Sequence, residues 1–342
     1  MSNHSVPHNQ LSLGKEEISA AKRVIESKWL AQGKEVQAFE DELCSFLGLP
    51  NGHAVAFGSC SISLYFALWA LDAKLKKVAF PVYVSRVIKG ASGLNGGKEV
   101  YLDIEAEGPN VDLNSLELFK SDILIVPHMF GIPSDIRKIK HLDIIENCAH
   151  CLGGKIGGSS AGLIGRIGVL SFQATKLITS GGMGGALISK DRALVDYVRD
   201  YRDFDERHDM FDHLNYRMTD IQAAIGREQL KKYTRWIDIR ENLYQLYKSF
   251  GLPLLDASPE ADVSPIRYRA VLRTNNPSKI IKALEAHSVK AIVPIERWEL
   301  ISKDEKFVNA INLTQNSVSL PIYPDLTENK ALEIAKIVSD AI

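Results

Sequence analysis

The sequence is poor in features that mark several classes of protein. Only four of its 342 residues are cysteines, and the formal net charge is −1. So few cysteines are typical of reduced thiols rather than of a disulfide framework. A nearly neutral chain also offers no excess of cations for contacts with nucleic-acid phosphates. The composition therefore argues against a disulfide-rich secreted domain and against a nucleic-acid-binding protein.

Long apolar runs are also missing from the chain. No stretch approaches the ~20 residues that a membrane-spanning helix needs. Residues 1–6 lack the basic and then apolar pattern of a signal peptide. We therefore expect a cytoplasmic protein without membrane association. The sequence contains no internal repeat and no low-complexity segment.

Cys148, His150 and Cys151 stand close enough together to suggest zinc. A structural zinc site needs four ligands, which come as two pairs in most motifs. The sequence has no second pair with matching spacing. We therefore predict no metal site.

What the chain does contain is a series of short apolar stretches. They cover residues 53–57, 77–83, 100–104, 123–128, 142–148, 167–172 and 186–189. Most are separated by segments long enough for a crossover helix, which favours an α/β protein with a mostly parallel sheet covered on both faces. Ligands of such sheets bind at the carboxyl ends of the strands.

The length and composition also indicate how the chain divides into domains. With 45% hydrophobic residues, the 342-residue chain can form one large domain and a smaller C-terminal one. The composition changes at residues 252–256, and residues 258–264 have the composition of a linker. We predict a large domain at residues 1–250 and a small domain at 251–342; the N-terminal segment can pack on the small domain.

Lys176 is the first candidate for a catalytic residue. It follows one of the apolar stretches and precedes the glycine-rich segment 180–185. Such a lysine either extends to the surface or lies in a site where desolvation lets its free amine attack a carbonyl. The glycines favour the second interpretation, because they let the backbone pass close to a bound ring or phosphate.

The turn at residues 58–61, Gly-Ser-Cys-Ser, precedes a helical pattern. Free amides at the start of a helix attract an anion such as phosphate. Alternatively, Ser59 or Ser61 only caps the helix. Ser171 could add a hydroxyl to the same anion, provided that the fold brings the two strand ends together.

Several motifs occur together in a specific order. They are Ser59-Cys60-Ser61, Phe80-Pro81, Asp103-Ile104, His128 with Gly131, Glu146 to His150, Ser171 to Lys176, Asn215 to Met218 and Leu320 to Pro324. This set resembles the DegT/StrS family of sugar aminotransferases, over nearly the whole chain. The resemblance implies pyridoxal phosphate as cofactor and the fold type I of aspartate aminotransferase. It thus implies a large domain with a mostly parallel mixed sheet between helices, and a small C-terminal α+β domain.

The resemblance also implies roles for individual residues. Lys176 matches the lysine that binds pyridoxal phosphate covalently. Ser61, with the amide of Cys60, matches the phosphate-binding turn, and Ser171 matches a second phosphate ligand. His150 matches the residue that faces the phenolic oxygen of the cofactor.

Gln173 belongs to the same strand-end motif and is expected in the cofactor site. Asn215 matches a loop residue that reaches the phosphate of the partner subunit, and Arg217 beside it is expected to contact the substrate. Active sites shared in this way imply a homodimer.

The chain departs from the family at Asn147, where the family has an aspartate paired with the pyridine nitrogen. The anionic partner keeps that nitrogen protonated, which makes the ring a sink for electrons. An amide can offer a hydrogen bond through its donor or its acceptor end, but it supplies no charge. Either Asn147 is tolerated in an active enzyme or it impairs transamination.

A second group of departures lies around the cofactor ring and the substrate. Val84 and Ser85 stand where the family has threonine and an aromatic that stacks on the ring. Tyr83 would share the face of Ser85 in an extended backbone and could replace this aromatic. Cys60 adds a side chain where the family has glycine, and residues 292–298 lack the tyrosine and histidine usual near the sugar nucleotide.

Two functions are consistent with these residues. The first is transfer of an amino group from an amino acid, expected to be glutamate, to a keto-sugar linked to a nucleotide. The alternative is a family member that binds pyridoxal phosphate or a sugar nucleotide without transaminating, in a regulatory role or in other pyridoxal-phosphate chemistry. Asn147 is the residue that separates the two.

Overall fold

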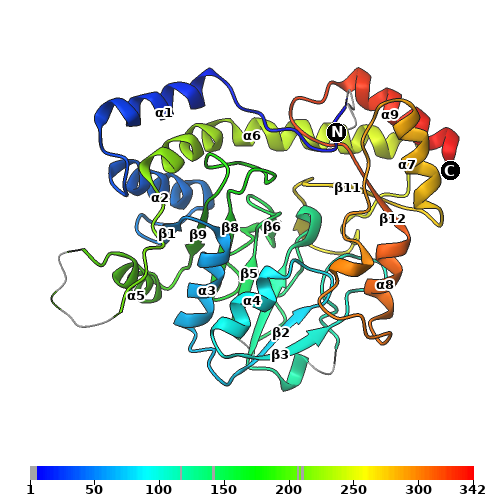
Figure 1. Ribbon diagram of the computed structural model, residues 1–342. Helices are drawn as coiled ribbons and strands as arrows, with labels where there is room; N and C mark the ends of the chain where they lie inside the picture. Colours follow the sequence, from blue (N-terminus) through cyan, green and yellow to red (C-terminus); the bar gives the residue numbers. More distant parts are fainter. Residues whose placement is uncertain (1–5, 116–117, 141–142, 206–207, 209–211) are drawn as a thin grey trace.

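A seven-stranded sheet forms the centre of the protein (Figure 1). The computed structural model describes residues 6–115, 118–140, 143–205, 208 and 212–342. The strands, in spatial order, are β1 (Ala54–Phe57), β9 (Gly185–Ile188), β8 (Ile167–Ser171), β5 (Asp143–Asn147), β4 (Ile123–Pro127), β2 (Lys77–Pro81) and β3 (Lys98–Leu102). Only β9 runs antiparallel to its neighbours. The predicted mostly parallel mixed sheet is thus confirmed, and each predicted strand is present.

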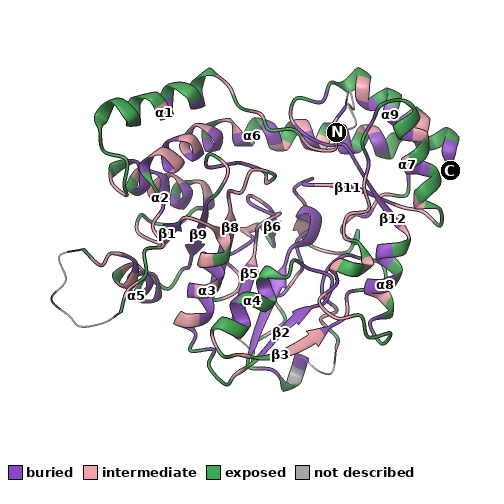
Figure 2. Ribbon diagram, in the orientation of Figure 1, coloured by how far each residue is buried: buried purple, intermediate pink, exposed green. Residues whose placement is uncertain are grey.

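Two apolar cores lie on opposite faces of this sheet, because successive side chains of a strand point to opposite sides. Val55 and Phe57 of β1 pack in one core with α3 (Cys60–Ala70). Ala54 and Ala56 pack in the other core with α2 (Lys34–Leu47) and with the first half of α6 (Asp220–Ser249). Both faces are covered, so the sheet is buried throughout its central strands (Figure 2).

The remaining helices lie around this sandwich and over the C-terminal part. They are α1 (Lys15–Ser27), α4 (Val87–Leu94), α5 (Arg192–Arg202), α6 (Asp220–Ser249), α7 (Pro277–Ala286), α8 (Val308–Gln315) and α9 (Glu328–Ala341). Two small sheets complete the fold: β10 (Val263–Ser264) with β6 (Lys155–Ile156) and β7 (Ser159–Ser160), and β11 (Ala270–Arg273) with β12 (Ser317–Leu320). In the part of the chain that the structure describes, no helix is both long and apolar enough to cross a bilayer.

The long helix α6 connects the two halves of the molecule (Figure 1). Its first half packs against α1 and α2, and its second half packs against α9. The helix ends at Ser249, and Val6 of the N-terminal segment pairs with Val289 beside the C-terminal helices. We keep a domain boundary after residue 250 as a proposal, since the chain leaves the long helix there.

Candidate active site

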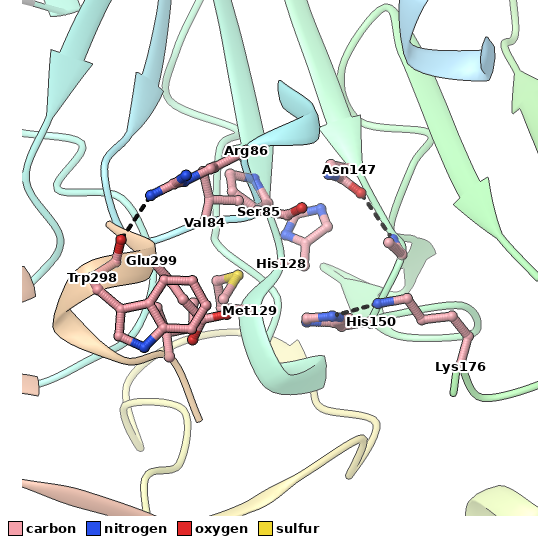
Figure 3. Close-up of a pocket in the computed structure, with 13 residues that line it drawn as sticks. Val84, Ser85, Arg86, His128, Met129, Asn147, His150, Lys176, Trp298 and Glu299 are labelled. Carbon is pink, nitrogen blue, oxygen red and sulfur yellow. Dashed lines mark hydrogen bonds between the residues drawn. The ribbon is translucent and has the colours of Figure 1, made fainter. Parts of the chain in front are cut away.

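The predicted site residues gather where strands of the parallel sheet end. Asn147 is the last residue of β5, Ser171 is the last residue of β8, and Lys176 follows β8 by five residues. Asn147, His150, Lys176 and Ser85 line one cavity of about 360 Å³ (Figure 3). The fold therefore brings residues from three separate motifs to one edge of the sheet, as the rule for parallel sheets predicts.

A second cavity of about 250 Å³ adjoins the first and shares Ser85, Asn147, Ala149 and Lys176 with it. Its other lining residues include Cys60, Ser61, Ser171 and Gln173. The hydroxyls of Ser61 and Ser171 therefore line the second cavity only, while Lys176 lines both cavities.

The start of α3 forms one wall of the second cavity. The Ser59 side chain caps this helix by accepting from the Ile62 amide at 3.4 Å. Ser61 is exposed and free for another partner. Ser59 therefore caps the helix and leaves the Ser61 hydroxyl for an anion, so both interpretations of the motif are compatible with the structure.

The glycine-rich segment after Lys176 passes very close to this turn. A Cβ atom on Gly185 would overlap the backbone of Cys60, so only glycine permits this approach. Burial raises the pKa of the Cys60 thiol to about 11, although the Lys176 charge and the Ser171 hydroxyl oppose the rise. The thiol is therefore neutral and adds no negative charge to the cavity.

Lys176 Nζ lies 2.9 Å from His150 Nε2 (Figure 3). Burial lowers the pKa of His150 well below its usual value, and the charges of Lys176 and Arg269 lower it further. The imidazole is therefore neutral. Where the Lys176 amine donates, His150 Nε2 is the acceptor and Nδ1 carries the hydrogen.

Tyr268 is a site residue that the sequence analysis missed. Its ring stacks on His150 with centroids 4.2 Å apart, and its hydroxyl donates to the Thr175 carbonyl at 3.2 Å. Burial opposes ionisation of Tyr268, but the positive charges of Lys176 and Arg269 bring its pKa below the usual value. Tyr268 lies in no motif, and only the packing of distant segments places it behind His150.

Asn147 is held in one orientation by the backbone. Its Oδ1 accepts a hydrogen bond from the Ala149 amide at 3.1 Å (Figure 3). The acceptor end of the side chain is therefore occupied, and the Nδ2 hydrogens remain for a partner in the cavities. The sequence did not indicate whether the donor or the acceptor end of the Asn147 amide faces a ligand. In the structure, Asn147 offers the donor end.

Glu146, the residue before Asn147, is buried and fully hydrogen-bonded. It accepts from His128 Nε2 at 2.9 Å and from the amides of Gly162, Ile164 and Gly165. Burial opposes its charge, but His128 and these amides bring the pKa of Glu146 below its usual value.

The ligand atoms of Glu146, His128 and Cys148 lie within 4.8 Å of one another. The Glu146 oxygens are already engaged with the backbone, so this group is explained by hydrogen bonds within the protein. His150, which the sequence places between the two cysteines, points instead to Lys176.

The structure does not bring Tyr83 to the site. Its side chain is fully buried and meets Phe130 edge to face, with centroids 6.1 Å apart. Residues 82–84 form a bend, so the alternation of an extended strand, which would have placed Tyr83 beside Ser85, does not apply. Ser85 lines both cavities, whereas Tyr83 lines neither. The expectation that Tyr83 replaces the ring-stacking aromatic is therefore corrected: its side chain belongs to the core.

Asn215 and Arg217 lie beside the turn at residues 58–61 but line neither cavity of their own chain. The Gly58 amide donates to the Tyr216 carbonyl at 3.0 Å, which fixes the loop next to the turn. Arg217 forms an ion pair with Asp205, and Asn215 is exposed. The guanidinium predicted to contact substrate is thus engaged within its own chain.

Comparison with known proteins identifies the family. Residues 11–339 match the model of the DegT/DnrJ/EryC1/StrS aminotransferase family. The chain belongs to this family. Its members are pyridoxal-phosphate-dependent enzymes, so pyridoxal phosphate is the cofactor and the protein is an aminotransferase, as the sequence motifs predicted.

Similar proteins agree with this assignment along their full length. The chain is 26% identical to the spore coat polysaccharide biosynthesis protein SpsC of Bacillus subtilis, over 99% of this chain and 98% of that protein. It is 24% identical to the GDP-perosamine synthase of Escherichia coli O157:H7, over 98% of each. The crystal structure of the aminotransferase TlmJ from Streptoalloteichus hindustanus superposes with a TM-score of 0.90, at 19% identity and 98% coverage of each chain.

Proposed function

We propose that the protein transfers an amino group from an amino acid, with glutamate as donor, to a keto-sugar linked to a nucleotide. The observation that carries this proposal is the position of Lys176, which lines both the cavity with the Ser61 and Ser171 hydroxyls and the larger cavity beside it. Similarity to GDP-perosamine synthase and to a polysaccharide biosynthesis protein supports a sugar as acceptor. The reduced cysteines support a cytoplasmic location.

The second cavity has the donors that the phosphate of the cofactor requires. Ser61 and Ser171 offer hydroxyls, and the start of α3 offers backbone amides and the positive end of its dipole. Gly185 permits the close approach of β9 to the Cys60 backbone, which a side chain would overlap. We therefore assign phosphate binding to Ser61, Ser171 and the Cys60 amide, with Gln173 beside them.

The first cavity supplies the groups that act on the substrate. Lys176 is the residue that we assign to covalent binding of the cofactor and to moving the proton at the substrate carbon. The neutral imidazole of His150 accepts from Lys176 and orients its amine. Pyridoxal phosphate itself supplies a conjugated ring that takes up negative charge from that carbon.

Asn147 favours a second candidate function, in which the protein binds the cofactor or a sugar nucleotide but transaminates slowly or not at all. Its Nδ2 can donate to the pyridine nitrogen, which accepts only when it is unprotonated. A ring without that proton is a weaker electron sink. We rank transamination first, because Lys176, His150, Ser61 and Ser171 all line the two cavities.

We also propose a homodimer with shared sites. Asn215 is exposed and lies beside the turn at residues 58–61 without lining either cavity of its own chain. Its Oδ1 accepts from the Arg217 amide at 3.2 Å, so its Nδ2 hydrogens are the part of the side chain available to a partner subunit. Arg217 is engaged with Asp205, and a contact with substrate would require that pair to open.

The spectrum of the cofactor-loaded protein tests the proposed function. The lysine-bound cofactor absorbs visible light, and this band should disappear when glutamate converts the cofactor to its amino form. A nucleotide-linked keto-sugar should then restore the band. A band that persists in glutamate would favour the second candidate.

A further inference from the structure

A third cavity lies close to the active site and shares no lining residue with the two cavities described above. Its volume is about 210 Å³, and its walls come from the N-terminal segment, from Thr175 and from the C-terminal part of the chain. Tyr268 lines this cavity, and its ring also stacks on His150, which lines the first cavity. One aromatic ring therefore contacts both regions.

Arg269 brings to the third cavity a positive charge that no carboxylate balances. The neighbouring Arg267 is paired with Asp256, whereas no carboxylate of the described residues lies within ion-pair distance of Arg269. Arg269 Nη1 lies 3.3 Å from His8 Nε2 and 3.4 Å from the Ser319 hydroxyl. A guanidinium offers five N–H donors, so donors remain for a ligand in the cavity.

The N-terminal wall of the cavity is electrically neutral. Burial lowers the pKa of His8 to about 3, and the positive charges of Arg269 and Lys290 add to this effect. The imidazole is therefore uncharged at neutral pH, while two cations act on the region around it. This balance of charge favours an anionic ligand.

The rest of the cavity limits the size and the nature of this anion. Its volume corresponds to about seven water molecules at ~30 Å³ each, which is too small for a nucleotide. Ile292 and Ile322 also line it and give it an apolar wall. Such a wall is buried favourably by an aliphatic group and gains nothing from an inorganic anion.

From this combination of charge and shape we infer that the third cavity binds a small carboxylate with a short aliphatic chain. The Arg269 guanidinium pairs with the carboxylate, and Ile292 and Ile322 contact the chain. The inference does not depend on the proposed function, because none of these side chains lines the cavities that contain Lys176.

A ligand in the third cavity is linked to the active site in two ways. The Tyr268 hydroxyl donates to the carbonyl of Thr175, the residue before Lys176, at 3.2 Å. After burial and the Lys176 charge, the charge of Arg269 also lowers the pKa of His150. An anion paired with Arg269 opposes this last effect, so binding in the third cavity is coupled to the contact between Lys176 and His150.

Calorimetric titration of the cofactor-loaded protein with butanoate tests the role of the cation. Butanoate should bind, and butanamide, which has the same shape without the charge, should bind at least about tenfold more weakly. Arg269→Gln should weaken butanoate binding about tenfold or more. Arg166→Gln is the matched control: Arg166 is paired with Asp143 and lines none of the three cavities, so binding should be unchanged.

The role of the cavity itself is tested by filling it. Ile292→Phe adds volume to the apolar wall while Arg269 stays in place, so butanoate should bind about tenfold more weakly. Ile18→Phe makes the same change at a residue that is 70% exposed and lines none of the three cavities, and it should have no effect. The ring signals of His8 in NMR spectra give a local measurement: butanoate should raise the pKa of His8, because its charge offsets that of Arg269.

Three results would overturn the inference. They are no binding of butanoate at millimolar concentration, equal affinity in Ile292→Phe and the wild type, or binding of inorganic phosphate as tight as that of butanoate. The proposed function is judged separately, by the conversion of the cofactor in glutamate without butanoate. Loss of that conversion with intact butanoate binding would refute transamination and leave the third cavity as a carboxylate site.

Discussion

The Lys176 amine and the His150 imidazole meet at 2.9 Å, although the two residues follow different strands of the sheet. Tyr268 supports the imidazole from the C-terminal part of the chain through a ring contact of 4.2 Å. The orientation of the amine thus depends on three segments at once. This arrangement explains how a lysine in a polar loop can be held toward a cavity instead of extending into solvent.

Replacing Lys176 should abolish covalent binding of the cofactor. Borohydride reduction of the wild type followed by peptide mapping should place the pyridoxyl group on Lys176, and Lys176→Ala should carry no label. The glutamate half-reaction should fall by about a thousandfold or more. Lys190→Ala removes an exposed lysine of the same part of the chain and serves as the control. A label on another lysine would refute the assignment.

Restoring a carboxylate at position 147 should accelerate the reaction. Asn147→Asp keeps an acceptor for the Ala149 amide and adds the charge that protonates the pyridine nitrogen. The glutamate half-reaction should become about tenfold faster or more, since a factor of ten requires only ~1.4 kcal/mol of transition-state stabilisation.

The state of the nitrogen can be measured directly. In cofactor labelled with ¹⁵N, the chemical shift should indicate an unprotonated pyridine in the wild type and a protonated one in Asn147→Asp. A wild type that transaminates rapidly, with an aspartate variant that is no faster, would show that the asparagine is no handicap.

Hybrid dimers should reveal whether active sites are shared. Lys176→Ala and Asn215→Ala should each impair activity as pure dimers. After unfolding and refolding of an equal mixture, about half of the dimers should be hybrids, and each hybrid has one intact site and one inactive site. About a quarter of the wild-type number of active sites should therefore return. A monomer in sedimentation at micromolar concentration, or no recovery in the mixture, would contradict shared sites.

The N-terminal segment should make the fold sensitive to acid through His8. Burial and the charges of Arg269 and Lys290 lower the pKa of His8 to about 3, and its Nε2 bonds to the Ser319 hydroxyl at 2.9 Å. As the pH falls below about 6.5, His8 of the unfolded chain binds a proton that His8 of the folded chain does not. The free energy of unfolding therefore decreases by up to ~1.4 kcal/mol per pH unit, until His8 of the folded chain is also protonated at about pH 3.

Above about pH 7 neither state is protonated, and His8 contributes no pH dependence. The free energy of unfolding, measured in urea between pH 5 and 8, should therefore fall on the acid side less steeply in His8→Gln than in the wild type. An unaltered slope in His8→Gln would show that His8 titrates alike in both states.

Gly131 should tolerate no side chain. Its φ of +87° favours glycine, and a Cβ there would overlap the Ile266 carbonyl, next to the segment that carries Tyr268. We expect Gly131→Ala to destabilise the protein by ~4 kcal/mol or more. Gly158, with φ of +77° and open space around it, is the control, and Gly158→Ala should cost ~1 kcal/mol. Equal Tm values for the two variants would contradict this account.

The strands, and the edge of the sheet at which the site lies, can be predicted from the pattern of apolar and polar residues. Short apolar stretches predict buried strands, and parallel strands place their carboxyl ends at one edge. Lys176, Ser171, Asn147 and Ser61 could therefore be assigned to one site from their positions after such stretches, and the structure places all four along two adjoining cavities.

Only the tertiary structure decided which side chains point into those cavities. Tyr83 turns into the core because the chain bends after β2, while Tyr268 and Trp298 reach the site from segments far along the chain. The donor end of Asn147 is likewise selected by one backbone amide. A local pattern of apolar and polar residues predicts helices, strands and their ends. The side-chain contacts of the site depend instead on bends and on packing between segments far apart in the chain, which a local pattern does not predict.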